Sequence, residues 1–133
     1  MIVAIHVATG GAIGALSGSR TRALLLGPPA HLLADRVPHQ DIASRRFEIA
    51  SGAACLALLA VRRGPFDRAT LGAMAASAPD LEHIFPVVRP HGRKLFHGRH
   101  GWHRSGAFPA SVQLVLAGAI VGFLLGPRRS TRS

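Results

Sequence analysis

The chain has 133 residues, with 16 Lys and Arg against 6 Asp and Glu, so its formal net charge is +10. This length suits one domain, and the single cysteine, Cys55, excludes an internal disulfide and a thiolate zinc cage. The basic excess favours anionic partners such as phosphate, nucleic acid or anionic lipid, although arginines also serve as plain solvated surface.

Apolar runs broken by arginine, proline and glycine predict an all-α fold, and no segment alternates as a strand would. About five apolar helices are expected, near residues 1–19, 21–37, 44–62, 68–85 and 108–126. The prolines of the second range leave two interpretations open: a kinked helix, or a fresh helix with proline in its first turn. We expect one compact helical domain, 1–133, with a basic His-rich loop at 87–105 and a basic C-terminal tail at 127–133.

The first and last of these helices favour a membrane-embedded bundle. Residues 1–19 and 106–127 contain no Asp, Glu, Lys or Arg. Each segment carries glycines spaced four apart, a pattern that lets helices approach closely in lipid. These glycines are Gly10, Gly14 and Gly18 in the first segment and Gly118, Gly122 and Gly126 in the last. We expect the two glycine ridges to pack tightly, against each other or against a neighbour.

Acidic residues are scarce, and four of the six stand close to histidine in two short stretches. In the first stretch, His31 and Asp35 are four apart and therefore share one face of a helix. Pro38 ends that helix, because it has no N–H and disfavours helical geometry at the preceding residue. His39 and Asp41 follow on the turn and can fold back toward the same point.

The second stretch, Asp80-Leu81-Glu82-His83, places Asp80 and His83 three apart on one helical face. A further group of histidines lies in the basic, glycine-rich segment: His91, His97, His100 and His103. Imidazole nitrogen and carboxylate oxygen are ligands that zinc, manganese and iron accept. We therefore expect His31, Asp35, Asp80 and His83 to converge. His6 should approach the same point, and at least one of His97, His100 and His103 should cap it.

A metal-dependent hydrolase is the leading hypothesis from this pattern. Its divalent metal, zinc or manganese, is held by His6, His31, Asp35, Asp80 and His83. The metal lowers the pKa of a bound water, and Glu82 or Asp41 is the candidate general base. An anionic substrate, best a phosphoester near the membrane surface, is bound by basic residues of the 89–104 segment. The substrate-binding candidates are Arg99, Arg104, His97 and His100.

Three other interpretations use the same features. His–Asp pairs can form a buried polar network that fixes helix register without any metal. The chain can also be a non-catalytic membrane protein that binds a partner or anionic lipid through its basic loops. Nucleic-acid binding is disfavoured, because the sequence shows no recognition helix, zinc finger or aromatic stacking platform.

The order of the motifs resembles a known family. The sequence shows His31-xxx-Asp35 with Pro38-His39, then Pro79-Asp80-x-Glu82-His83, then a His-rich loop before a last apolar helix. This order is similar to that of the small bacterial inner-membrane-associated metal-dependent hydrolases of the LexA-binding type. The resemblance implies a metal-dependent hydrolase in the bacterial inner membrane. It implies ligands at the matching positions, which are His6, His31, Asp35, Asp80, His83 and His103.

The chain also departs from that family. Glu82 stands where Asp is usual, and the late motif reads Arg99-His100-Gly101-Trp102-His103-Arg104-Ser105 in place of the family's HRxxTHS pattern. A weaker similarity, resting on HxxxD alone, connects the chain to the zinc-dependent phospholipase C and S1/P1 nuclease group.

Overall fold

The computed structural model describes residues 1–85, 92, 95–97 and 104–126. In that part of the chain the long helices are α1 (Val3–Leu16), α2 (Arg20–Ala34), α3 (Arg45–Arg63), α4 (Arg68–Ser77) and α6 (Ala110–Leu125). After α4, a 3-10 turn η1 (Ala78–Asp80) and the one-turn helix α5 (Leu81–Ile84) continue the chain. The prediction of a compact all-α bundle of about five helices is confirmed. Most of the predicted His-rich loop, and the tail at 127–133, lie outside the described residues.

Helix α2 decides between the two interpretations left open by its prolines. It runs without interruption through Pro28 and Pro29, so the single-helix interpretation is correct. The helix begins after Ser19, whose side chain accepts a hydrogen bond from the Arg22 N–H, as an N-cap should. It ends at Ala34, with Asp35 as its C-cap, three residues before the predicted end at residue 37.

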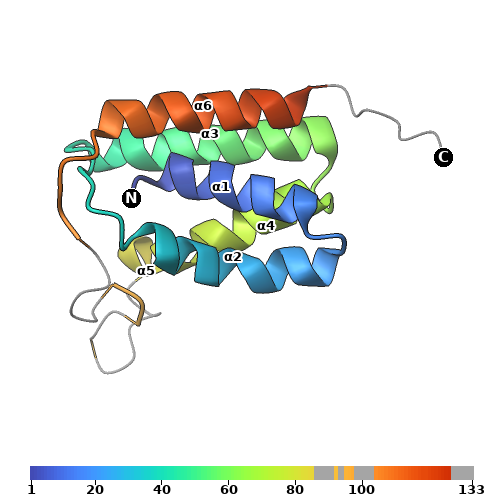
Figure 1. Ribbon diagram of the computed structural model, residues 1–133, viewed down its shortest axis with the longest axis horizontal. Coiled ribbons are helices and arrows are strands. Elements are labelled where there is room, and N and C mark those ends of the chain that lie inside the picture. The colour runs from blue at the N-terminus through green and yellow to red at the C-terminus, as the bar shows by residue number, and fades with distance from the viewer. Residues whose placement is uncertain (86–91, 93–94, 98–103, 127–133) are drawn as a thin grey trace.

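Helix α1 lies at the centre of the bundle and contacts α2, α3, α4 and α6 (Figure 1). Its closest neighbour is α4, because glycine replaces side chains where the two helices meet. A Cβ added at Gly10 would lie 2.3 Å from Ala76 Cβ, and one added at Gly14 would lie 2.2 Å from the Arg68 carbonyl oxygen. The first glycine ridge therefore packs tightly, as predicted, and its partner is α4.

The glycine ridge of α6 behaves differently from that of α1. A Cβ added at Gly118 or Gly122 would meet no atom of the described residues within 4 Å. Helix α6 does pack on α1, but through Ala117, Val121 and Leu124, which are buried in the core. The expected packing of the two ridges against each other is therefore wrong.

No helix in the described part of the chain is long and apolar enough to cross a membrane. Helices α1 and α6 are apolar, but they have only 14 and 16 residues. They are thus about 21 and 24 Å long, whereas a bilayer's hydrocarbon core is ~30 Å thick. Helix α3 has 19 residues but begins and ends with arginines. The transmembrane helices expected from the sequence are not found among these residues.

Backbone pairing beside α2 holds the end of the bundle where the functional candidates gather. The His39 N–H donates to the Arg104 carbonyl at 3.1 Å, and the His39 carbonyl accepts from the Gly106 N–H at 2.9 Å. Gln113 of α6 is fully buried; its Nε2 donates to the Gln40 carbonyl at 2.9 Å and its Oε1 accepts from the Ile2 N–H at 3.1 Å. These contacts join the start of α1, the chain after α2 and the start of α6.

Candidate metal centre

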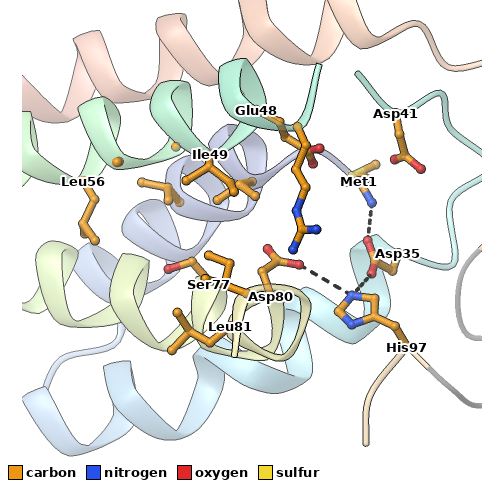
Figure 2. Close-up of a pocket in the computed structure, with 16 residues that line it drawn as sticks. Met1, Asp35, Asp41, Glu48, Ile49, Leu56, Ser77, Asp80, Leu81 and His97 are labelled. Carbon is orange, nitrogen blue, oxygen red and sulfur yellow. Dashed lines mark hydrogen bonds and ion pairs between the residues drawn. The ribbon is translucent and has the colours of Figure 1, made fainter. Parts of the chain in front are cut away.

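Four side chains from three parts of the chain converge at this end of the bundle. His31 and Asp35 come from the last turn of α2 and its C-cap, Asp80 ends η1, and His97 lies in the described segment 95–97. Figure 2 shows Asp35, Asp80 and His97 directed toward one another. The sequence predicted that His31, Asp35 and Asp80 converge, and the structure brings them together.

The distances between the ligand atoms suit a single ion. His31 Nε2 lies 3.2 Å from His97 Nε2 and 3.4 Å from Asp35 Oδ2, and His97 Nε2 lies 3.2 Å from Asp35 Oδ2. Asp80 Oδ1 is slightly farther, 3.8 Å from His31 Nε2 and 3.5 Å from His97 Nε2. Around zinc, with bonds of ~2.0–2.2 Å, tetrahedral ligand atoms lie roughly 3.3–3.6 Å apart. Three of these atoms therefore match one face of a tetrahedron, and Asp80 Oδ1 lies within 3.8 Å of both histidine nitrogens.

Asp35 is the centre of this cluster and is almost completely buried. Its Oδ2 faces the two ligand histidines, while its Oδ1 lies 3.0 Å from His6 Nε2 and contacts the amino group of Met1. Burial alone would raise the pKa of Asp35, but hydrogen bonds from His31, His6 and His97 outweigh it and hold the pKa well below its usual range. Asp35 is therefore ionised at any physiological pH.

His6 supports the cluster from α1. Its side chain is fully buried, and its ring lies against that of His31 with the centroids 3.9 Å apart. Burial lowers the pKa of His6 to about 3, so the ring is neutral and donates from Nε2 to the Asp35 carboxylate. The predicted approach of His6 to the site is thus present, through Asp35.

Glu82 forms an outer layer behind His97. Its Oε2 accepts hydrogen bonds from the N–H groups of Leu95 at 2.7 Å and Phe96 at 3.1 Å. Its Oε1 accepts from the His97 N–H at 2.7 Å and from His97 Nδ1 at 2.6 Å. Burial would raise the pKa of Glu82, but these hydrogen bonds prevail and lower it to about 2. The contacts suit an orienting role, and the general-base role that the sequence suggested for Glu82 stays a prediction.

The hydrogen bond to Glu82 determines which ring nitrogen of His97 faces the cluster. Because Nδ1 donates to the Glu82 carboxylate, Nε2 is the ring nitrogen that faces Asp35, Asp80 and His31; it donates to Asp35 while it carries a proton and offers a lone pair to a metal once that proton leaves. Metal-binding histidines commonly show this arrangement, in which the ring nitrogen that does not bind the metal donates a hydrogen bond to a carboxylate. The sequence named His97 both for substrate binding and as one of three histidines that could cap the cluster, and the structure brings it to the cluster, among the candidate ligand atoms.

The two carboxylates of the cluster offer oxygen atoms that a metal ion could bind. Asp35 Oδ2 and Asp80 Oδ1 lie 3.2 and 3.5 Å from His97 Nε2, and Asp80 Oδ2 is buried with no hydrogen-bond partner among the described residues. Burial raises the pKa of Asp80 to about 6. Burial would lower the pKa of His97, but hydrogen bonds to Asp35 and Glu82 prevail and raise it. The donor set, two imidazoles and two carboxylates, fits a divalent ion, and both Asp80 and His97 must lose a proton before they bind it.

The remaining candidates lie around or outside this cluster. His39 is buried, with Nδ1 2.6 Å from the Val37 carbonyl and Nε2 3.2 Å from Asp41 Oδ1, and Asp41 is half-exposed. Arg104 is exposed, and its backbone N–H donates to the Asp35 carbonyl at 3.3 Å. The general-base role of Asp41 and the substrate role of Arg104 stay predictions. Four other candidates lie outside the described residues: the side chain of His83, and Arg99, His100 and His103.

A cavity of about 450 Å³ opens beside the ligand atoms. Asp35, Asp80 and His97 line one end of it, and Figure 2 shows Ile49 and Leu56 farther along. The charged residues Asp41, Arg45 and Glu48 also line it. The cavity gives a small molecule access to Asp80 and His97.

No family model, curated protein or solved structure matches this chain. The resemblance to the inner-membrane hydrolases therefore stays a prediction, and the function is argued from the geometry of the site.

Zinc affinity is expected to fall as the pH is lowered from about 7.5 to about 5. A proton must leave Asp80, whose pKa is raised to about 6, and another must leave His97, whose pKa is also raised, before both can bind a metal. Affinity is therefore highest above these pKa values. Protonation of Asp80 alone weakens binding about tenfold at pH 5, because that pH is one unit below its pKa. Competition titrations with a chelating dye at several pH values measure this, and a flat profile would contradict it.

Proposed function

We propose that this chain is a metal-dependent hydrolase in which His31, Asp35 and His97 hold one divalent ion, zinc or manganese. Asp80 completes the site on the side of the cavity. The observation that carries the proposal is the mutual approach of the three ligand atoms to 3.2–3.4 Å. His31 and His97 are 66 residues apart in the sequence, so helix geometry alone gives no reason for their meeting.

The surroundings of the cluster support hydrolysis as the reaction. A bound divalent ion supplies a water molecule of lowered pKa. Glu82 already accepts four hydrogen bonds, whereas Asp41 lines the cavity beside the cluster, so Asp41 is the stronger of the two predicted candidates for the general base. A bound divalent ion together with Arg45 would offset the carboxylates that line the same cavity, which allows an anionic substrate such as a phosphoester.

The proposed location is the surface of the bacterial inner membrane. Large apolar side chains stand exposed on α1 and α6, with exposed fractions of 87% for Leu16, 71% for Val115 and 86% for Phe123. Such apolar exposure marks contact surfaces for membranes or proteins, and a net charge of +10 attracts anionic lipid. The same surface supports the alternative function, a non-catalytic membrane protein that binds a partner or anionic lipid.

Metal removal tests the hydrolase proposal. Purified protein loaded with zinc or manganese is expected to hydrolyse bis(p-nitrophenyl) phosphate, to lose this activity with a chelator, and to regain it with one equivalent of metal. Asp41→Asn should lower kcat by ~10²–10⁴, the usual contribution of a general base, and should leave metal binding unchanged. Stoichiometric metal binding without any hydrolysis of ester probes would overturn the enzyme proposal and leave the binding alternative in the lead.

A further inference from the structure

The cavity beside the cluster continues as an apolar groove between α3 and the segment from α4 to α5. Helix α3 contributes Ile49, Gly52, Ala53 and Leu56, which recur at intervals of three, four and seven residues. Such a stripe on a helix normally faces another helix. Here Gly52 packs closely on Val3 of α1, and the stripe also lines the cavity, whose other sides are formed by Val3 and Val7 of α1 and by Leu81 and Ile84 of α5.

Polar and apolar groups are separated along this groove. Asp35, Asp80 and His97 lie at one end, and Arg45 and Glu48 stand on the first turn of α3. Beyond them Ser77 is the one polar side chain among the described lining residues, and its hydroxyl already donates to the Ala73 carbonyl at 3.0 Å. From Arg45 to Leu56 the groove follows α3 for about 16 Å.

We propose that the groove binds the alkyl chain of an amphiphilic substrate whose anionic head lies at the metal cluster. Binding of the anionic head at the metal cluster depends on the proposed function. Binding of the alkyl chain depends only on the residues that line the groove. The substrate class is thus a single-chain lipid-like ester. Its head needs the bound metal, because Asp35, Asp80 and Glu48 would otherwise repel an anion.

The size of the cavity suits a small molecule with an alkyl chain. A volume of about 450 Å³ falls within the ~300–1,000 Å³ of small-molecule sites. Leu81 and Ile84 are 45% and 42% exposed, so the groove is open to an entering chain along α5.

Alkyl phosphates of increasing length test the inference. Methyl, hexyl and dodecyl phosphate are titrated into the zinc-loaded protein by calorimetry, below their micelle concentrations. Each methylene that enters the groove should raise the affinity about fourfold, since a fully buried CH₂ contributes ~0.8 kcal/mol. The affinity should level off once the chain is longer than the groove.

A matched pair of variants on α3 locates the chain. Ala53→Phe fills the groove and should weaken dodecyl phosphate binding about sixtyfold, as the loss of three buried methylenes would, with methyl phosphate changed less than about twofold. Ala54→Phe is the control, because Ala54 is exposed on the same helix and does not line the groove. Circular dichroism checks the fold of both, and the milder pair Ala53→Leu and Ala54→Leu replaces them if either unfolds.

The outcomes separate the two proposals. Equal affinity for methyl and dodecyl phosphate, or equal losses in the Ala53 and Ala54 variants, would overturn the inference. If the protein retains no zinc but longer chains still bind better, and Ala53→Phe removes that preference, the groove stands and the metal-dependent hydrolase fails. If the protein retains zinc but affinity does not depend on chain length, the metal site stands and the alkyl groove fails.

Discussion

Replacing Asp35 by Asn is expected to abolish stoichiometric zinc binding while leaving the helical content largely intact. Asp35 Oδ2 lies within 3.4 Å of both His31 Nε2 and His97 Nε2, so the substitution removes one ligand atom and the central negative charge. Substitutions of residues that hydrogen-bond to metal ligands weaken metal affinity 10–100-fold. Loss of a ligand itself should weaken the affinity further, on the order of a thousandfold or more. Asn has nearly the same shape, and His6 can still contact its side-chain oxygen.

Asp67→Asn is the matched control for this prediction. Asp67 pairs with Arg63 Nε at 2.8 Å and caps α4 through the Ala69 N–H at 3.0 Å. Asn also caps helices well, so this variant should lose about 1 kcal/mol of unfolding free energy or less and no zinc. Zinc content is measured by elemental analysis of dialysed protein. Wild-type affinity in Asp35→Asn would show that the cluster is a polar network, and Asp80→Asn repeats the test if the first variant unfolds.

The sequence predicted the helices well, because their ends are marked by local chemistry. Ser19 and Ser44 cap α2 and α3, and Gly64 ends α3 with a φ of +96° that favours glycine. The expected helix at 68–85 is interrupted where Pro79 tightens the chain into η1. His31, Asp35 and Asp80 could be named as site residues because each lies on or beside a helix whose face the spacing defines.

The rest of the site could not be derived in the same way. His97 lies in a segment with three other histidines and no periodicity, and nothing in the sequence distinguishes it from His91, His100 or His103. The hydrogen bonds of Glu82 to the 95–97 backbone depend on the path of the chain between them. The pairing of His39 with residues 104–106 also joins distant segments, and no sequence pattern sets its register.

The membrane-spanning interpretation of the first helix failed for a physical reason. A helix that is apolar on all sides is buried either in lipid or in protein, and sequence alone does not distinguish the two. Helix α1 is surrounded by α2, α3, α4 and α6, and its Ile5, Val7 and Ala8 form the core. The small residues of α1 allow close packing against α4. The same glycine spacing also allows close packing of helices in lipid, so the spacing alone does not distinguish the two environments.

Replacing Gly72 by Ala is expected to lower the free energy of unfolding by about 3 kcal/mol or more. An added Cβ would lie 2.4 Å from the Gly10 carbonyl oxygen and 2.7 Å from Gly14 Cα. Both atoms belong to the backbone of α1, so neither can move without shifting a helix that contacts most of the bundle. Overpacking usually costs 1–3 kcal/mol, and backbone contacts lie at the upper end of that range.

Gly118→Ala is the control, because it makes the same change in a helix where a Cβ meets open space. It should stabilise the protein by up to ~1 kcal/mol, since Ala favours a helix more than Gly does. Urea denaturation followed by circular dichroism measures both variants against the parent protein. The two substitutions should thus move the unfolding midpoint in opposite directions. Equal shifts would mean that α1 and α4 do not approach as closely as Gly10, Gly14 and Gly72 allow, and the position of His6 beside Asp35 would then lose its support from α4.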